Sequence, residues 1–179
     1  MSERERLISD EYRALQAELH RNPDYGSASV VFAPIVSKIC EQYGVQEILD
    51  YGAGKGRLAQ HLRTKRPIRM TMYEPAMPQW SARPEPAEMV ACVDVLEHIE
   101  PEKLEHVLDD LRRCLKRVGF FSVSTVAAEK TLSDGRNAHL IIEPSSWWLP
   151  RIQSRWDLEC FQRVEDGFFV IVTPRALRP

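Results

Sequence analysis

The chain has 179 residues, of which 44% are hydrophobic and 28% charged, a composition typical of one soluble globular domain. Its formal net charge of -2 creates no overall field that attracts nucleic acid or an anionic membrane. Its apolar runs are far shorter than the ~20 residues that span a bilayer, and residues 1–6 are polar, unlike a secretory signal. Four widely spaced cysteines favour reduced thiols in the cytoplasm over a disulfide framework or a metal site.

Hydrophobic periodicity predicts two helices before the first strand. Residues 3–20 and 28–43 both carry apolar side chains at helical spacing, and Gly44 is placed to end the second helix. A short apolar strand over 47–51 leads into a glycine-rich turn, after which a helix begins at Arg57.

Strands and helices alternate along the remaining chain. We predict strands at 69–73, 89–93, 120–124, 157–164 and 168–173, and helices from Pro101 to about Gly119 and over 145–155. This alternation predicts a Rossmann-like, doubly wound, mostly parallel sheet in an α/β fold, and the closely spaced final pair predicts a C-terminal antiparallel hairpin. Ligands of such sheets bind beyond the carboxyl ends of the strands.

Alternate glycines follow the first strand in the run Asp50-Tyr51-Gly52-Ala53-Gly54-Lys55-Gly56. Glycines permit a tight turn and let a ligand approach the backbone. The turn also fits a dinucleotide pattern, with Glu74 where a ribose-binding acid is expected. The Asp50 carboxylate argues against a pyrophosphate, because two like charges ~4 Å apart repel by about 4 kcal/mol at an effective dielectric near 20. The same carboxylate favours the ammonium and sulfonium groups of S-adenosylmethionine.

Three motifs together resemble the class I S-adenosylmethionine-dependent methyltransferases: the run Asp50–Gly56, then Tyr73-Glu74-Pro75, then Asp94-Val95-Leu96-Glu97-His98-Ile99. The resemblance covers residues 45–128 and extends weakly to the end of the chain. It implies S-adenosylmethionine as the cofactor, and a single domain over 1–179 in which residues 1–44 form a lid over a core at 45–179. The residues that it assigns to the cofactor are Asp50, Gly52, Ala53, Gly54, Gly56, Glu74, Pro75, Asp94 and Val95.

The sequence departs from the family between Glu74 and Asp94, where only 19 residues stand in place of the usual strand and helix. We therefore expect the third strand of the family's sheet to be short or absent. The acid with which the family reads adenine then has no clear counterpart. Trp80 either stacks on the purine or covers the edge of the sheet.

A polar run, Ser133–His139, follows the strand candidate at 120–124, where the resembling family commonly builds its acceptor pocket. We predict an acceptor pocket formed by Asp134, Arg136, Asn137 and Trp147, with His139 as the catalytic base, because the unperturbed pKa of histidine lies near the working pH. An ordinary turn explains the run equally well, since Asp-Gly is a strong turn former. Glu97 and His98 are also attractive as a catalytic pair, although we favour the family's use of them as a helix entry.

The sequence thus predicts S-adenosylmethionine-dependent methyl transfer to an oxygen or nitrogen atom of a small-molecule acceptor. We expect no added recognition domain, which disfavours polymeric substrates. A basic cluster over 63–69 fits a solvated helix end better than a nucleic-acid site. Two alternatives stay open: a nicotinamide-dependent oxidoreductase, and a non-enzymatic S-adenosylmethionine-binding subunit of a complex.

Overall fold

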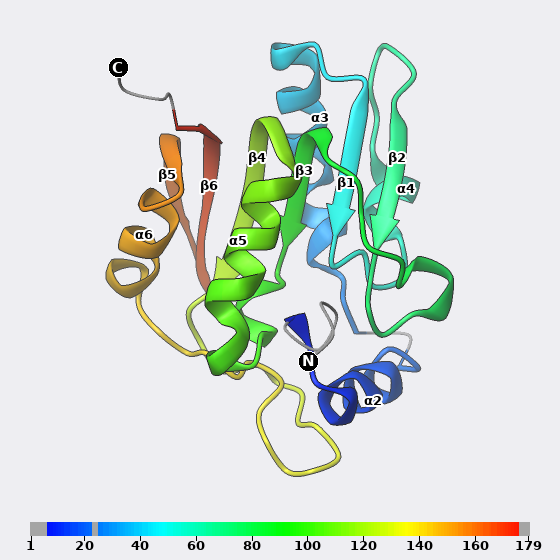
Figure 1. The fold of residues 1–179 in the computed structure, drawn as a ribbon, viewed down its shortest axis with the longest axis vertical. Helices are drawn as coiled ribbons and strands as arrows, with labels where there is room; N and C mark the ends of the chain where they lie inside the picture. Colours follow the sequence, from blue (N-terminus) through cyan, green and yellow to red (C-terminus); the bar gives the residue numbers. More distant parts are fainter. Residues whose placement is uncertain (1–6, 23–24, 176–179) are drawn as a thin grey trace.

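A six-stranded sheet forms the centre of the computed structural model, which describes residues 7–22 and 25–175 (Figure 1). The strand order is β2-β1-β3-β4-β6-β5. Strands β2, β1, β3 and β4 are parallel, whereas β6 pairs antiparallel with β4 and β5. The predicted sheet and its C-terminal hairpin are therefore confirmed. The strands are β1 (Glu47–Tyr51), β2 (Arg69–Tyr73), β3 (Ala87–Val93), β4 (Leu115–Ser124), β5 (Trp156–Val164) and β6 (Gly167–Pro174).

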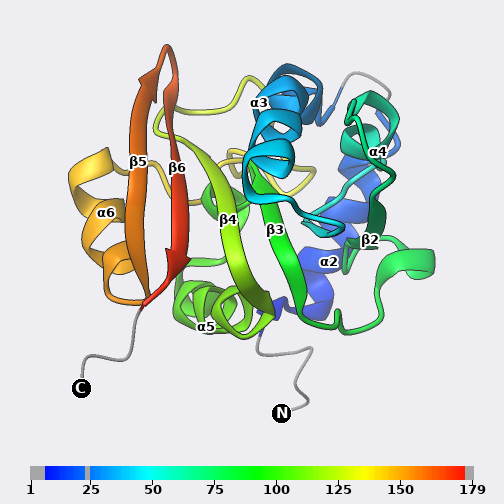
Figure 2. The same ribbon diagram turned by 90° about the horizontal axis from the view of Figure 1, so that it is seen from above.

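Helices cover both faces of this sheet (Figure 2). Helices α3 (Ala28–Tyr43) and α4 (Arg57–His61) pack on one face, and α5 (Leu104–Cys114) and α6 (Ser145–Gln153) pack on the other. Helix α2 (Asp10–Leu19) lies beyond the carboxyl ends of β1 and β2 (Figure 1). No helix in the described part of the chain is long and apolar enough to cross a membrane.

The first long helix is shorter than its sequence pattern suggested. Ser9 caps α2, because its side chain accepts a hydrogen bond from the Tyr12 backbone N–H. The predicted start of this helix, at residues 3–6, lies outside the described residues.

The boundary between α5 and β4 also differs from the prediction. We expected the helix to continue to Gly119, but β4 begins at Leu115, directly after the helix. Leu115 and Val118 are buried and pair with β3, so the burial of these two side chains overrides the helical pattern. Gly119 instead lies inside the sheet, where a Cβ atom would stand 2.4 Å from the Leu115 side chain.

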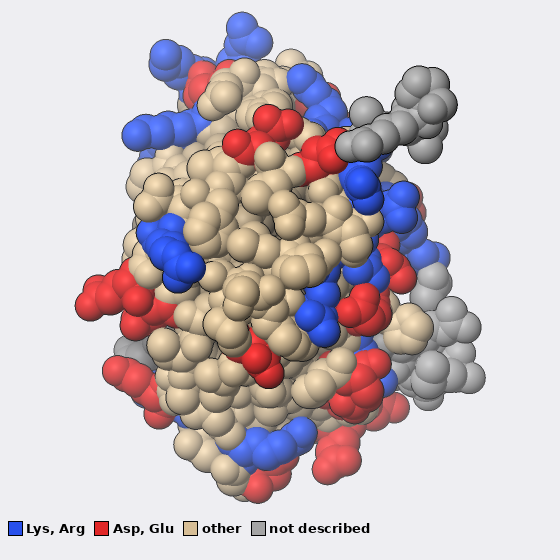
Figure 3. Space-filling view, turned by 90° about the vertical axis from the view of Figure 1, so that its left-hand side faces the viewer, with Lys and Arg blue, Asp and Glu red and all other residues tan. Residues whose placement is uncertain are grey.

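The link between β2 and β3 contains one short 3-10 helix, η1 (Pro78–Trp80). The third strand of the family's sheet is therefore absent, as its short segment predicted, and β2 forms one edge of the sheet. The opposite edge is formed by β5, and the face on that side has basic side chains dispersed among acidic ones (Figure 3).

Candidate functional site

A cavity of about 630 Å³ lies beyond the carboxyl ends of β1, β2, β3 and β4, within the size range of small-molecule sites. One wall comes from the turn after β1 and the segments that follow β2 and β3. The opposite wall comes from α2 and residues 25–32. Eight of the nine residues assigned to the cofactor line this cavity: Asp50, Gly52, Ala53, Gly54, Glu74, Pro75, Asp94 and Val95.

The glycine turn needs its glycines for two different reasons. Gly52, Gly54 and Gly56 have φ angles of +80°, +52° and +68°, a region that residues with a side chain rarely adopt. A Cβ atom at Gly52 would also lie 2.3 Å from the Val95 side chain, so the turn packs closely on the segment after β3.

Gly56 is the one cofactor candidate outside the cavity lining. It precedes α4, and a Cβ atom there would lie 2.9 Å from Met72 Sδ and 3.1 Å from the Trp80 ring. The packing of Trp80 against this turn favours the interpretation in which Trp80 covers the sheet edge. Gly56 is explained by the turn and its packing, without a ligand.

Asp50 is an almost fully buried acid at the end of β1. Its exposed fraction is 3%, and its Oδ2 atom has no hydrogen-bond donor among the described residues. Burial raises the pKa of Asp50 to about 7, and the nearby Glu74 carboxylate adds to this shift. A buried oxygen without a donor is costly, and a cationic group in the cavity would satisfy it.

Glu74 follows β2 and faces the same part of the cavity. Its Oε2 atom accepts from the Gly54 N–H at 3.2 Å, and its Oε1 atom accepts from the Ala76 N–H at 3.0 Å. Burial raises the pKa of this carboxyl group, whereas the two backbone donors lower it. The carboxylate is thus fixed in position, and each oxygen keeps a second lone pair for a ligand.

His20 Nε2 lies 3.7 Å from Glu74 Oε2. Burial and then the charge of Lys55 lower the pKa of His20 to about 4. His20 is therefore neutral at neutral pH, and its contact with Glu74 is not an ion pair.

Asp94 has an unusual backbone conformation directly after β3. Its φ angle is +52°, the only positive value among the described residues other than glycine, and such strain costs about 1–3 kcal/mol. Its Oδ1 atom accepts from the Ser122 hydroxyl at 2.8 Å, and its N–H donates to the same hydroxyl oxygen at 3.0 Å. Strained residues cluster at functional sites, and the β4 residue Ser122 was not identified from the sequence.

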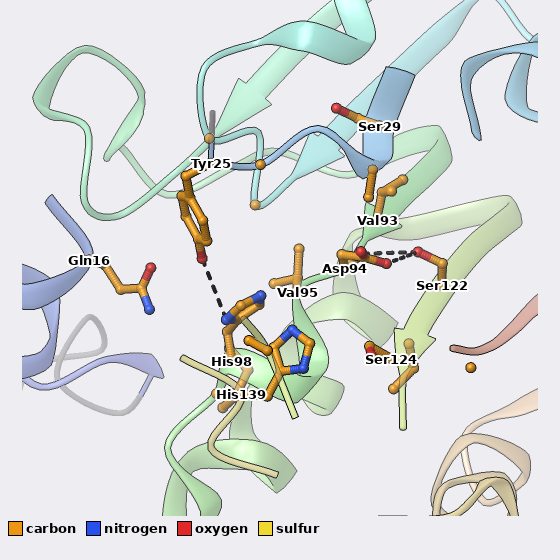
Figure 4. Close-up of a pocket in the computed structure, with 18 of the residues that line it drawn as sticks. Gln16, Tyr25, Ser29, Val93, Asp94, Val95, His98, Ser122, Ser124 and His139 are labelled. Carbon is orange, nitrogen blue, oxygen red and sulfur yellow. Dashed lines mark hydrogen bonds between the residues drawn. The ribbon is translucent and has the colours of Figure 1, made fainter. Parts of the chain in front are cut away.

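His98 and His139 lie side by side at the cavity, with ring centroids 4.7 Å apart (Figure 4). The Nδ1 atom of His98 is 2.7 Å from the Ala138 carbonyl oxygen, and that of His139 is 2.6 Å from the Val126 carbonyl oxygen. Since a carbonyl only accepts, both Nδ1 atoms carry the proton, and in the neutral rings both Nε2 atoms keep a free lone pair. Burial, followed by the charge of His139, lowers the pKa of His98 to about 3.

The four residues predicted to form the acceptor pocket do not line the cavity. Asp134 and Arg136 are exposed and pair with each other at 2.7 Å. The Arg151 guanidinium lies over the Trp147 ring, with its Cζ atom 3.5 Å from the centroid of that ring. Asn137 has a supporting position, because its side chain bonds the Ala128 backbone and accepts from the His139 N–H at 2.9 Å. The polar run thus forms a turn whose last residue, His139, reaches the cavity.

Several lining residues were missed by the sequence analysis, above all the α2 face made by Tyr12, Gln16 and His20. Tyr12 donates its hydroxyl proton to the His98 carbonyl oxygen at 2.5 Å, and Gln16 donates to the Tyr12 oxygen at 2.6 Å. The available signal was three polar side chains spaced four residues apart on the helix face that also carries apolar residues.

Comparisons with known proteins point to one family. A family model described as a methyltransferase domain matches residues 2–166. None of the curated proteins matches this sequence. Among solved structures, the chain resembles 1,6-didemethyltoxoflavin-N1-methyltransferase of Burkholderia thailandensis, with a TM-score of 0.64, 17% identity, and coverage of 93% of this chain and 90% of that chain.

Two further solved structures have the same fold. For the DhpI–SAH complex the TM-score is 0.58 and the identity 18%, with 94% of this chain and 95% of that chain covered. For mitomycin 7-O-methyltransferase the TM-score is 0.65 and the identity 14%, with 89% of this chain and 60% of that chain covered. These likenesses show the fold. The family model supports a methyltransferase over the two alternatives that the sequence left open, a nicotinamide-dependent oxidoreductase and a non-enzymatic binding subunit. The chain belongs to the methyltransferase-domain family and is an S-adenosylmethionine-dependent methyltransferase.

Proposed function

We propose that this enzyme methylates an oxygen or nitrogen atom of a small-molecule acceptor inside the 630 Å³ cavity. The observation that carries the proposal is the composition of the cavity walls. The glycine turn, Asp50 and Glu74 lie on the cofactor side, and the paired rings of His98 and His139 complete the site. S-adenosylmethionine, when bound, supplies a methyl group activated by its sulfonium.

The residues around the glycine turn fit this cofactor. The unpartnered Oδ2 of Asp50 would receive the ammonium of the methionine part. The Glu74 carboxylate, oriented by two backbone N–H groups, would accept hydrogen bonds from the ribose hydroxyls. Each hydrogen bond to a charged acceptor contributes roughly 1.5–3 kcal/mol. Ala53, Gly54, Pro75, Asp94 and Val95 would border the rest of the cofactor.

His139 is the residue that we propose as catalytic. Methyl transfer from a sulfonium is an in-line displacement, so the protein must align the acceptor and remove its proton. The Nδ1–H of His139 is held by the Val126 carbonyl, which leaves Nε2 free to take that proton. Asn137 fixes the His139 backbone, and neutral His98 beside it adds no opposing charge at neutral pH.

The N-terminal helices serve as a lid in this proposal, over a core that starts at residue 45 of a single domain. Support comes from the lining residues on α2 and from contacts that hold α2 down. Ser9 donates from its N–H and its hydroxyl to the Glu100 carboxylate, at 2.8 Å and 2.6 Å. A covered cavity favours small acceptors over polymers. The four free cysteines support a location in the cytoplasm.

The acceptor class can be tested by supplying methyl-labelled S-adenosylmethionine to a size-fractionated cell extract with the full chain. We expect label in the low-mass fraction with the wild-type protein, and much less with His139→Ala. The matched control is His106→Ala, an exposed histidine on α5, which should label like the wild type. Label confined to protein or nucleic acid would contradict the proposal.

A further inference from the structure

Glu97, His98 and His139 form a cluster that the methyl-transfer scheme uses only in part. One ligand atom from each residue lies within 4.8 Å of the others. Glu97 and His98 belong to the 3-10 helix η2 (Leu96–His98) after β3, whereas His139 comes from the turn after β4. Two imidazoles and a carboxylate from separate segments of the chain are thus brought together. The two imidazoles face the cavity (Figure 4).

Each of the two histidines has a hydrogen bond of the kind that orients metal-binding histidines. Histidine ligands usually donate their second ring N–H to a carbonyl or carboxylate, which fixes the tautomer and the direction of the ring. His98 donates to the Ala138 carbonyl and His139 to the Val126 carbonyl, at 2.7 Å and 2.6 Å. Because Nδ1 of each neutral ring carries the proton, the Nε2 lone pair of each ring is free to bind a cation.

Glu97 supplies an independent observation, because it is a fully buried acid with one oxygen unused. Its exposed fraction is 0%, and Oε1 accepts from the Ser124 N–H at 2.7 Å. Oε2 has no hydrogen-bond partner among the described residues. A bound cation would remove the cost of the unpaired buried oxygen.

We propose that Glu97, His98 and His139 bind one divalent transition-metal ion at the acceptor side of the cavity. Two imidazoles and one carboxylate form a ligand set that suits Zn²⁺ or a similar ion better than Mg²⁺ or Ca²⁺, which prefer oxygen ligands. Ligand bonds of about 2.0–2.2 Å require the three ligand atoms to draw closer together than the 4.8 Å limit within which they lie. A fourth coordination position would then face the cavity.

The role of this ion rests on the proposed function. An acceptor hydroxyl at the open position would have a lowered pKa and lose its proton to solvent, which prepares the oxygen for methylation. In the metal-bound protein His139 would therefore act as a ligand, and in the metal-free protein as the base.

Metal binding can be measured without cofactor or acceptor. We would titrate Zn²⁺ into the chelator-treated full chain by calorimetry, and record the visible spectrum with Co²⁺ to identify the ligands. We expect one ion per chain, a Co²⁺ spectrum without thiolate bands, and affinity at least about 100-fold weaker in His139→Ala and Glu97→Gln. His106→Ala, which removes an exposed histidine, should bind like the wild type.

Separate measurements of metal binding and of cofactor binding distinguish a failure of the metal site from a failure of the proposed methyl transfer. If Glu97→Gln does not fold, the metal affinity of His139→Ala tests the site, because His139 is half-buried and its removal leaves the core intact. S-adenosylhomocysteine binding to the chelator-treated protein tests the cofactor site alone and should persist in His139→Ala. Absence of one-to-one Zn²⁺ binding, or unchanged affinity in His139→Ala, would overturn the metal site whatever the cofactor titration shows.

Discussion

Glu74→Ala removes the carboxylate that we assign to the ribose of the cofactor. In the structure this carboxylate is 8% exposed and fixed by the N–H groups of Gly54 and Ala76. The loss of this acceptor should weaken binding by roughly 2–4 kcal/mol, less than two full hydrogen bonds to a charged group, because water can hydrate the ribose hydroxyls in the variant. Affinity for S-adenosylhomocysteine should therefore fall by a factor of about 30 to 1,000, since 1.4 kcal/mol corresponds to about tenfold.

Calorimetric titration of S-adenosylhomocysteine measures this loss directly. Glu88→Ala is the matched control, because Glu88 also accepts a backbone N–H, that of Gln46 at 2.7 Å, but lies outside the cavity lining. The control should bind with wild-type affinity. A folded Glu74→Ala protein that also binds with wild-type affinity would refute the assignment of this acid.

Three further predictions concern the same cavity. Gly52→Ala should lower the free energy of unfolding in urea by about 2–4 kcal/mol, because the new Cβ atom would clash with Val95 and the residue would keep a positive φ angle. Gly135→Ala, at a φ angle of +89° with open space around it, should lower this free energy less. Equal losses in the two variants would contradict the close packing on Val95. The affinity for S-adenosylhomocysteine should fall as the pH drops below about 7, because Asp50 becomes protonated and no longer attracts the ammonium group of the ligand. Asp50→Asn should make the affinity nearly independent of pH in this range. An unchanged pH dependence in this variant would show that Asp50 does not bind the ammonium group. His139→Ala should keep cofactor affinity but lower turnover by about 10²-fold in a steady-state assay, and full turnover would remove its catalytic role.

Local sequence signals were sufficient for most of the fold and for the residues that form one wall of the cavity. The glycine turn and the acids that follow β1 and β2 are contiguous motifs, and the parallel strands bring their carboxyl ends to one edge. The missing third strand was also predictable, because 19 residues are too few for a strand and a crossover helix.

The wall of the cavity that carries His98 and His139 depended on contacts that no local pattern contains. His98 and His139 meet only because β3 and β4 are neighbours and because Asn137 turns the following segment toward the cavity. Asp134 looked functional for its chemistry, but its carboxylate is used in a local pair with Arg136. The burial that makes Glu97 and His20 unusual likewise comes from the tertiary structure, so their shifted pKa values were invisible in the sequence.

The most direct test of the account is a crystal structure of the full chain with S-adenosylhomocysteine bound. We predict that the amino group of the ligand lies beside Asp50 Oδ2, its ribose hydroxyls bond to Glu74, and its sulfur faces the ring of His139. A ligand bound outside this cavity, or one whose sulfur points away from His98 and His139, would contradict it.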